Sequence, residues 1–383
     1  MGATATLTQT ALVGGPDGDI ILSNAAPLPP PVLEDDQVAV SVRAVSLNPV
    51  DTKMTGGYHT VGAISGCEFA GVVTAAGAVA KKDWGIQPGD RVTAAIMGMN
   101  PLRPRIGAFA QNAVAPARCV LKMRDDWDFA KSAGIGNAWY TVAWSLFHVM
   151  GLPAGPELEP LNTELPPPQL DGPRIAINNF AGPNTKKATV LVSGGSSSTG
   201  TCAIQLLKIA GFNVVATCSE RNFDLVRSYG ADAVFSHSSP TATADIKAYT
   251  RNSLRLALDC ITTLDTTRLC YESFGRSGGR YVALDPYSEA IAATREAVKA
   301  DWVLGPEMIG EDVGWPAPHG RKANPIAKRF CDSWNRTLQN LLDRGVIRTH
   351  PQRVLDTGLA GALDGFEDIR SKKVSGEKLT YTL

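Results

Sequence analysis

The segment from Ala188 to Ser219 constrains the fold more than any other part of this sequence. A β-branched and apolar run, Thr189 to Val192, ends at a pair of glycines, as a buried strand entering a tight turn does. The apolar residues that follow have the spacing of one helix face and precede a glycine stop: Ala203, Leu206, Leu207, Ala210 and then Gly211. A second β-branched strand, Val214 to Thr217, completes a βαβ unit. Its turn lies at the helix N-terminus, where free N–H groups and the helix dipole favour a phosphate.

The turn between this strand and helix departs from the usual dinucleotide-binding pattern at one position. Its three glycine positions are held by Gly194, Ser197 and Gly200, so a serine stands in the middle. The hydroxyl-rich run 196–199 still offers donors to a pyrophosphate. The alternative is a flexible Gly/Ser loop between two core strands, but a bare linker has no reason to precede an amphipathic helix. We therefore predict a dinucleotide site at this turn.

The residues after the second strand indicate which dinucleotide binds. An acid at the strand tip would hydrogen-bond the ribose hydroxyls of NAD, whereas hydroxyl and basic groups accommodate the 2′-phosphate of NADP. The strand ends in Cys218-Ser219-Glu220-Arg221-Asn222, with no acid at the tip and an arginine within reach. This pattern favours NADPH. Glu220 is the competing residue, and it would favour NAD if its side chain pointed inward.

Length and charge exclude several classes of protein. A chain of 383 residues exceeds the usual single core, so two domains are expected. Lys plus Arg equals Asp plus Glu at 37 each, which argues against nucleic acid or an anionic membrane as a partner. The sequence has no run of eighteen apolar residues and no secretory leader, so a cytoplasmic protein is expected. Its seven scattered cysteines contain no CxxC pair and predict neither disulfides nor a structural zinc site.

The order of patterns along the chain predicts an α/β protein with two domains and one insertion. Residues 1–150 carry short β-type runs that indicate a compact β domain, followed by a helical stretch over 125–150. Residues 151–185 are a Pro-rich insertion without a period. In residues 186–325 strands alternate with helices, the doubly wound pattern of a Rossmann domain with a parallel sheet. Residues 326–383, a helix and a strand-like tail, are expected to return to the first domain.

Two sets of motifs carry a resemblance to a known family. The first set occurs in the order found in medium-chain dehydrogenase/reductases of the quinone oxidoreductase and enoyl reductase branch: Asn48-Pro-Val-Asp51, Glu68-Phe-Ala-Gly71, Gln87-Pro-Gly-Asp-Arg-Val92, Gly107-Ala-Phe-Ala110 and the Gly194 turn. The second set more narrowly resembles the trans-acting enoyl reductases that serve fungal highly reducing polyketide synthases, the lovastatin type: Asp51-Thr-Lys-Met54, Ala216-Thr-Cys-Ser219, Asn222-Phe-Asp-Leu225, Ala257-Leu-Asp-Cys-Ile261, Trp302-Val-Leu-Gly-Pro306, Gly314-Trp-Pro-Ala-Pro318 and Ser375-Gly-Glu-Lys-Leu379.

The resemblance implies a GroES-like β domain made of both termini, a Rossmann domain between them, and a cleft where NADPH meets an enoyl thioester on an acyl carrier. The positions that match the family's NADPH contacts are Val50, Asp51, Thr52, Lys53, Gly194, Ser196, Ser197, Ser198, Thr199, Ser219, Glu220, Arg221, Asn222, His237, Leu284, Asp285, Val374 and Ser375. Those that match its acyl-chain contacts are Thr141, Val142, Ala143, Trp144, Ser145, Leu146, Phe147, Gly305, Pro306, Glu307, Met308 and Ile309. Three positions depart from the family, because Val50 replaces a serine, His237 a tyrosine and Asp285 an asparagine.

The sequence predicts catalysis without a metal. Zinc-dependent relatives use a Cys, a His in Gly-His-Glu and a later Cys to hold and polarise an alcohol oxygen. Here Asn48 occupies the region of the first ligand, and Cys67 stands where the His would be. Such a pair cannot assemble three protein ligands, and we interpret Cys67 as a small buried residue. Reduction of an already polarised C=C bond is then the expected chemistry.

The polar candidates for that reaction are few. Hydride delivered to the β-carbon of an unsaturated thioester moves negative charge to the thioester oxygen, which needs stabilisation, and the α-carbon needs a proton. Lys53 is the first candidate, with a surface lysine that contacts only ribose or phosphate as the alternative. Thr141 is the second, with a satisfied core residue as its alternative. Tyr58 and Tyr281 are weaker candidates, and water remains an alternative proton source.

Three functions stay open on the sequence alone. They are a trans-acting enoyl reductase that docks on a polyketide synthase, a free-standing quinone or enone reductase, and a non-catalytic docking subunit. A monomer is predicted, because the Pro- and Gly-rich segment 311–321 follows the expected edge of the Rossmann sheet and would block strand addition. For an acidic carrier the expected docking patch is Arg103 with Arg105.

Overall fold

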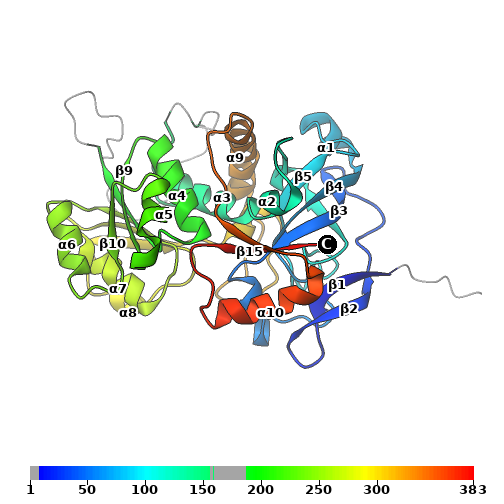
Figure 1. Ribbon diagram of the computed structural model, residues 1–383, viewed down its shortest axis with the longest axis horizontal. Coiled ribbons are helices and arrows are strands. Elements are labelled where there is room, and N and C mark those ends of the chain that lie inside the picture. Colours follow the sequence, from blue (N-terminus) through cyan, green and yellow to red (C-terminus); the bar gives the residue numbers. More distant parts are fainter. Residues whose placement is uncertain (1–7, 156–157, 159–186) are drawn as a thin grey trace, which may run out of the picture. The chain divides into compact units, whose positions relative to one another are not determined.

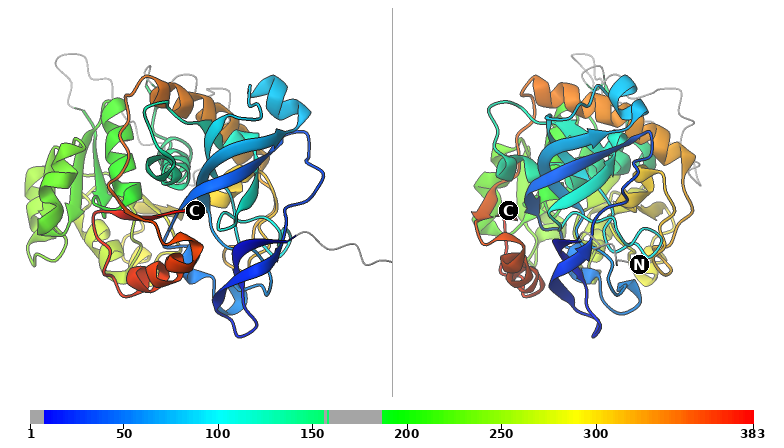
Figure 2. Two further views of the ribbon diagram at one scale, coloured as in Figure 1. Left: turned by 45° about the vertical axis from the view of Figure 1, so that its right-hand side comes forward. Right: turned by 90° about the vertical axis from the view of Figure 1, so that its right-hand side faces the viewer.

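A computed structural model describes residues 8–155, 158 and 187–383 of the chain, in two compact units (Figures 1 and 2). The first unit comprises Met1–Asn137 and Pro306–Leu383, and the second comprises Ala138–Gly305. The N-terminal and C-terminal parts of the chain therefore build one unit together, and the Rossmann segment is inserted between them.

The second unit is built on a six-stranded parallel sheet with the order β10-β9-β8-β11-β12-β13. Its strands are β8 Thr189–Ser193, β9 Asn213–Cys218, β10 Ala233–Ser236, β11 Leu256–Asp259, β12 Gly279–Ala283 and β13 Val298–Trp302. This is the doubly wound order, and its direction reverses between β8 and β11. The predicted Rossmann fold is therefore confirmed.

Helices bury the faces of this sheet because both sets of alternating side chains along its strands are apolar. Leu191, Val215, Ala257 and Tyr281 form one cluster with apolar residues of α6, α7 and α8. The amphipathic helix α4 packs on β8 and β9. The helices are α4 Ser198–Ile209, α5 Phe223–Ser228, α6 Ala242–Tyr249, α7 Leu264–Ser273 and α8 Glu289–Ala292.

The first unit contains a largely antiparallel sheet with the order β14-β15-β3-β4-β5-β7, to which β6 pairs through β3, and a separate pair β1-β2. Its strands are β1 Thr8–Gly14, β2 Ile20–Pro27, β3 Gln37–Ser46, β4 Glu68–Ala76, β5 Arg91–Ala95, β6 Asn112–Pro116, β7 Val120–Lys122, β14 Gln352–Leu355 and β15 Lys378–Thr382. Alternation places Val38, Val40 and Val42 of β3 in its core. The C-terminal strand β15 pairs antiparallel with β3, so the predicted GroES-like β architecture is confirmed.

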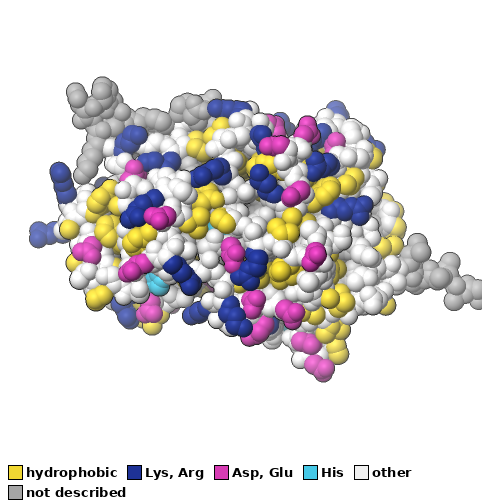
Figure 3. All heavy atoms as spheres, in the orientation of Figure 1, with side chains coloured by type: hydrophobic (Ala, Val, Ile, Leu, Met, Phe, Trp, Pro, Cys, Tyr) yellow, Lys and Arg dark blue, Asp and Glu magenta, His cyan; other side chains and the backbone are white. Residues whose placement is uncertain are grey.

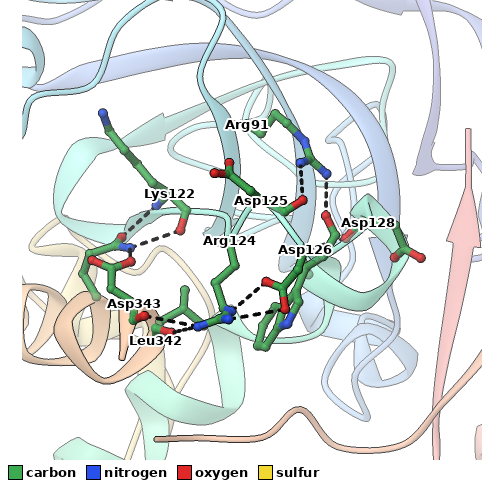
Figure 4. Close-up of polar contacts among 11 residues, drawn as sticks. Arg91, Lys122, Arg124, Asp125, Asp126, Asp128, Leu342 and Asp343 are labelled. Carbon is green, nitrogen blue, oxygen red and sulfur yellow. Dashed lines mark hydrogen bonds and ion pairs between the residues drawn. The ribbon is translucent and has the colours of Figure 1, made fainter. Parts of the chain in front are cut away.

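Four α-helices of the described chain lie wholly within the first unit: α1 Ala78–Asp83, α2 Phe129–Ala133, α9 Pro325–Asp343 and α10 Gly358–Arg370. The long helix α9 begins at Asn324, whose side chain accepts from the N–H groups of Ile326 and Ala327. Figure 4 shows how α9 is tied to the segment after β7, since Arg124 donates to the carbonyl groups of Leu342 and Asp343. Helix α10 was not among the predicted elements, although Leu359, Ala362 and Phe366 have helical spacing and are buried.

The unit boundaries differ from those expected. The stretch 125–150 divides into α2, α3 Gly136–Ala143 and a π-helix, Trp144–Val149. The π-helix packs on β12 and β13. The stretch therefore belongs to the second unit from Ala138 onward. Residues 306–325 belong to the first unit, where Gly314 N donates to Asn100 Oδ1 at 3.1 Å and Trp315 Nε1 donates to Met99 O at 2.9 Å. The edge strands of the Rossmann sheet are β10 and β13, and segment 311–321 belongs to the other unit. Most of the insertion 151–185 lies outside the described residues.

In the described parts of the chain, no helix is both long and apolar enough to cross a membrane. On the face drawn in Figure 3, Lys and Arg side chains alternate with Asp and Glu side chains. All seven cysteines are free thiols, and six of them are buried. The Sγ atoms of Cys119 and Cys331 lie 3.9 Å apart, within hydrogen-bond distance for sulfur, and form no disulfide.

Candidate cofactor and active site

The glycine turn after β8 lies where the strand order of the second unit reverses. Gly194 has a φ of 80°, in the left-handed region that glycine tolerates. Ser197 caps α4, because its Oγ accepts from Gly200 N at 3.0 Å and donates to Gly194 O at 2.7 Å. A Cβ at position 200 would lie 2.3 Å from Gly194 O. The serine in the middle glycine position therefore serves as the helix cap, and Gly200 permits close packing of helix and turn.

The same turn fits a pyrophosphate. The Oγ atom of Ser198 is buried and has no hydrogen-bond partner among the described residues. Asn222 Nδ2 donates to Ser196 Oγ at 3.2 Å, which ties the turn to the residues after β9. The first-turn N–H groups of α4 add donors and the positive end of a helix dipole. A negatively charged phosphate would satisfy these groups.

Polar side chains also gather at the carboxyl ends of β9 and β10. Ser219 Oγ lies 3.2 Å from Nε2 of His237, the residue that follows β10. Glu220 and Arg221 are exposed in the short 3-10 helix Glu220–Asn222 directly after β9. Hydroxyl, imidazole and guanidinium groups are the donors that bind a phosphate. This end of the sheet is thus equipped for the adenosine side of a dinucleotide.

Tyr281 is a structural residue and does not suit a role as proton donor. It is fully buried on β12, and its hydroxyl donates to Asp259 Oδ2 at 2.9 Å. Asp259 Oδ1 accepts from the N–H groups of Ile261 and Thr262, both at 3.1 Å. Burial raises the pKa of Tyr281 far above its ordinary value. The pair instead fixes the loop after β11, where Leu284 N donates to Thr262 Oγ1 at 3.2 Å.

In the first unit, residues 48–53 form a tight turn that continues into the 3-10 helix η1, Asp51–Lys53. Asp51 N donates to Asn48 O at 3.0 Å, and Asn48 N donates to Asp51 Oδ2 at 2.7 Å. The Asp51 side chain therefore points into the unit and is 1% exposed, whereas Lys53 is exposed. Of the residues expected on the cofactor here, Lys53 presents its side chain to the outside, and Val50 and Thr52 are half-buried.

The region that corresponds to a zinc site in other dehydrogenases holds an ammonium group. Lys378 Nζ forms an ion pair with Glu68 Oε1 and donates to Asn48 Oδ1 at 2.7 Å. Asn48 Nδ2 donates to the same Glu68 oxygen at 2.9 Å. Burial raises the pKa of the Cys67 thiol well above its ordinary value. Among the described residues no group of three or more His, Cys, Asp and Glu side chains is arranged to hold a metal ion, and a carboxylate already paired with lysine does not fit as a zinc ligand.

The stretch expected to contact the acyl chain is mostly buried apolar surface. Thr141 is half-buried near the C-terminal end of α3, and its carbonyl accepts from Ser145 Oγ at 2.7 Å. The buried residues that follow are Val142, Ala143, Trp144, Ser145 and Leu146. Trp144 stacks on His148 with ring centroids 3.9 Å apart. Here the helix widens to the π form, a distortion often found at functional sites.

Of the remaining candidates, Asp285 and Gly305 belong to the second unit, and residues 306–309, Val374 and Ser375 belong to the first. Within the 3-10 helix Gly305–Ile309, Met308 is buried and Glu307 is engaged by Arg321 and Asn324, each at 3.1 Å. Val374 and Ser375 are half-buried in the loop before β15. The expected docking arginines are used within the unit, because Arg103 pairs with Glu34 and Glu311, and Arg105 donates to the carbonyl groups of Leu28 and Pro29.

Residues 34–125 match the family model of the alcohol dehydrogenase GroES-like domain, and residues 198–291 match that of the zinc-binding dehydrogenase. The chain is 76% identical over 378 residues to trans-enoyl reductase tasC of Hapsidospora irregularis, covering 98% of both chains. It is 66% identical over 381 residues to trans-enoyl reductase cghC of Chaetomium globosum, covering 100% of both. The crystal structure of CurK enoyl reductase has the same fold, with a TM-score of 0.69, 15% identity and 98% coverage of both chains.

These similarities extend over both units of the chain. Identity of this extent along the whole chain is sufficient to establish family membership. The chain belongs to the trans-enoyl reductases, oxidoreductases of the medium-chain dehydrogenase/reductase family that act on a carbon–carbon double bond.

Proposed function

We propose that this enzyme uses NADPH to reduce the α,β-double bond of a polyketide thioester carried on the acyl carrier of a partner highly reducing polyketide synthase. The similarity to the trans-enoyl reductases supports the reaction. The single structural observation that supports the cofactor is the Ser219–His237 contact at the end of β9, beside an exposed Arg221. These groups suit a 2′-phosphate.

The cofactor would be held by the α4 turn through its pyrophosphate and by Ser219, Arg221 and His237 through its 2′-phosphate. When bound, it supplies a hydride to the β-carbon. Lys53 is proposed to donate a hydrogen bond to the thioester oxygen as negative charge develops there. Thr141 is proposed to orient the substrate carbonyl or the nicotinamide amide through its hydroxyl. The proton for the α-carbon is assigned to solvent, because Tyr281 is bonded to Asp259 in the core.

One comparison of substrates tests this function. NADPH oxidation is measured with an enoyl thioester of pantetheine and, separately, with a quinone. Turnover of the thioester is expected. Turnover of the quinone alone supports a free-standing quinone reductase, and tight NADPH binding without turnover of either supports a docking subunit.

The cofactor assignment is tested at Arg221. The substitution Arg221→Ala should weaken NADPH binding by about 1–3 kcal/mol, the scale of a lost charge-assisted hydrogen bond. It should leave NADH binding almost unchanged, because NADH lacks the 2′-phosphate. Arg227→Ala is the control, since Arg227 is an exposed arginine of α5 that pairs with Asp224. Equal losses for NADPH and NADH at Arg221 would exclude the 2′-phosphate role.

The substrate assignment is tested at Gly305. A tryptophan there, Gly305→Trp, should abolish reduction of long enoyl chains and spare NADPH binding, if residues 305–309 line the path of the acyl chain. A short enoyl thioester measured on the same variant is the internal control. Long-chain reduction at the wild-type rate would exclude these residues from the substrate site.

We also propose that the enzyme acts as a monomer. Both edge strands of the Rossmann sheet, β10 and β13, are short, and β13 carries a lysine and an aspartate among its five residues. Short, charged edges disfavour strand addition by a second copy. Light scattering should give the mass of one chain, and the mass of two chains would overturn this proposal.

A further inference from the structure

A carboxyl group that the reaction does not use lies beneath the 48–53 turn. Asp51 is 1% exposed, and its Oδ2 accepts from Asn48 N at 2.7 Å. Its other oxygen, Oδ1, is buried and has no hydrogen-bond partner among the described residues. The Cys67 thiol beside the carboxyl is only a weak donor.

The neighbourhood of Asp51 already contains one anion. Glu68 is 0% exposed, and its Oε1 is bound by Lys378 and Asn48, while its Oε2 accepts from Asn137 N at 2.9 Å. The single buried ammonium is therefore matched by the Glu68 carboxylate. Ionisation of Asp51 would add a second anion with an incomplete set of donors, which costs free energy in a buried site.

The turn connects this buried cluster to the surface. Asn48 contributes its side chain to the Glu68–Lys378 pair and its N–H group to Asp51, so Asn48 links the ion pair to the Asp51 carboxyl group. Two residues beyond Asp51, Lys53 is exposed and its N–H donates to Val50 O at 3.0 Å. The Asp51 carboxyl therefore holds the first residue of the same short turn that ends at Lys53.

We propose that Asp51 is a positioning residue for cofactor binding, and that the 48–53 turn holds its binding conformation while the Asp51 carboxyl is protonated. The inference rests on the proposed function only in taking the turn as part of the nicotinamide cofactor's site. Burial raises the pKa of Asp51 to about 7, the N–H of Asn48 and the thiol of Cys67 oppose this, and the charge of Glu68 adds to it. The Asp51 carboxyl group therefore changes from protonated to ionised within the physiological pH range.

Other charged groups near the turn leave this assignment in place. Lys378, on β15, opposes the rise but is paired with Glu68. His350 is neutral in this range, since burial and the charge of Lys378 lower its pKa to about 3. From α10, which packs on η1, Arg370 donates to Thr52 O at 3.2 Å and lies 4.0 Å from Glu367. Cys67 stays a thiol because burial raises its pKa.

The test is the dissociation constant of NADH and NADPH, followed by nicotinamide fluorescence between pH 6 and pH 8.5. NADH is included because it lacks the 2′-phosphate and so removes that group's own titration. For the wild-type enzyme the dissociation constant of both cofactors should rise above pH 7, by up to about tenfold per pH unit. The variant Asp51→Asn should lose this rise, because an amide accepts from Asn48 N at every pH.

The control is Asp90→Asn. Asp90 accepts from Gln87 N at 2.8 Å in a second X-Pro-x-Asp turn, but it is not buried. This variant should keep the wild-type pH profile. A wild-type affinity for NADH that is flat from pH 6 to pH 8.5 overturns the proposal without any variant, as does a common profile for wild type and Asp51→Asn. Failure of the NADPH assignment appears separately, as equal affinity for NADPH and NADH at a single pH.

Discussion

The first unit contains two turns of the same sequence type, Asn48-Pro-Val-Asp51 and Gln87-Pro-Gly-Asp90. In both turns the aspartate N–H donates to the carbonyl of the first residue, at 3.0 and 3.1 Å, and the carboxylate accepts from that residue's N–H, at 2.7 and 2.8 Å. The third residue differs: Val50 is helical, with a φ of −62°, while Gly89 is left-handed, with a φ of 94°. The first turn therefore continues into a 3-10 helix, and the second leads into the strand β5.

The larger difference between the two turns is burial. Asp51 lies over a buried Glu68–Lys378 pair, whereas Asp90 is half-exposed and pairs with Lys122 at 2.9 Å on the surface. Water screens the second pair and can satisfy any oxygen that the protein leaves free. The same local motif is thus a surface turn in one place and holds a buried carboxyl group in the other.

The largest effect is expected when the buried Lys378 of the first turn's neighbourhood is compared with the exposed Lys122 of the second. The substitution Lys378→Met leaves the Glu68 carboxylate buried without its cation and should lower the free energy of unfolding by about 3–5 kcal/mol. Urea unfolding followed by circular dichroism measures this loss. In the second turn, Lys122→Met should cost at most about 1 kcal/mol, because that pair is exposed.

Figure 4 shows why Lys122 is a suitable control. Its side chain points away from α9, and its backbone N–H and carbonyl form the bonds to Gln339, at 2.8 and 3.1 Å. A methionine keeps these backbone bonds and removes the contacts of the ammonium group to Asp90 and Gly85. Equal losses at positions 378 and 122 would show that burial does not distinguish the turns.

A second prediction concerns the pH dependence of stability. The pKa of Asp51 is raised from 3.8 to about 7 in the folded protein, so between these values the folded state binds the extra proton. Its contribution to stability is complete below about pH 4 and is lost as the pH rises to 7. The loss should amount to roughly 2–4 kcal/mol. Thermal unfolding of wild type and Asp51→Asn at several pH values measures it as their difference.

The expected sign is specific. Relative to wild type, Asp51→Asn should gain stability steadily from pH 4 to pH 7 and then keep a constant difference. Asp90→Asn provides the matched comparison and should show no such gain. If Asp51→Asn instead lost stability relative to wild type as the pH rises, the folded protein would favour the ionised form of Asp51, with its carboxylate stabilised by neighbouring groups.

The smallest effect is expected at the third turn residue. Gly89→Ala should destabilise by about 1–2 kcal/mol, because its φ of 94° disfavours a Cβ although no atom lies within 4 Å of the added carbon. Gly57→Ala is the control, since its φ is not left-handed and its added Cβ would meet only Pro316 Cγ at an ordinary 3.5 Å. Thermal unfolding compares the two. An unchanged midpoint for Gly89→Ala would argue against the left-handed turn.

Local patterns predicted the strand–turn–helix–strand fold of the segment from β8 to β9. The strands and the helix around the glycine turn were predicted, because periodicity and turn chemistry involve residues near one another in sequence. The helix cap at Ser197 and the close packing at Gly200 were not predicted, although they lie in the same short stretch. The contact between Ser219 and His237 joins two neighbouring strands of the same sheet, and the family resemblance already placed both residues at the cofactor.

Other predictions failed because distant contacts decided them. Tyr281 was a candidate proton donor, but β11 and β12 pair in parallel and bring its hydroxyl to Asp259 in the core. Segment 311–321 was placed with the Rossmann sheet, but Asn100 and Met99 hold it in the first unit across more than two hundred residues. The docking patch at Arg103 and Arg105 stays a prediction, although Arg103 pairs with Glu34 and Glu311 and Arg105 donates to the carbonyl group of Leu28.

The sequence by itself determined the alternation of strands and helices in the Rossmann domain and the glycine turn after β8, because each follows from periodicity and turn chemistry within a short stretch. Tertiary structure alone decided the state of Asp51 and the role of Lys378. The two X-Pro-x-Asp motifs predict the same local hydrogen bonds, and the ionisation of a carboxyl depends on the water and charges around it. Those are set by Cys67 and Glu68 at the start of β4 and by Lys378 of β15, a residue more than three hundred positions away from the turn in the chain.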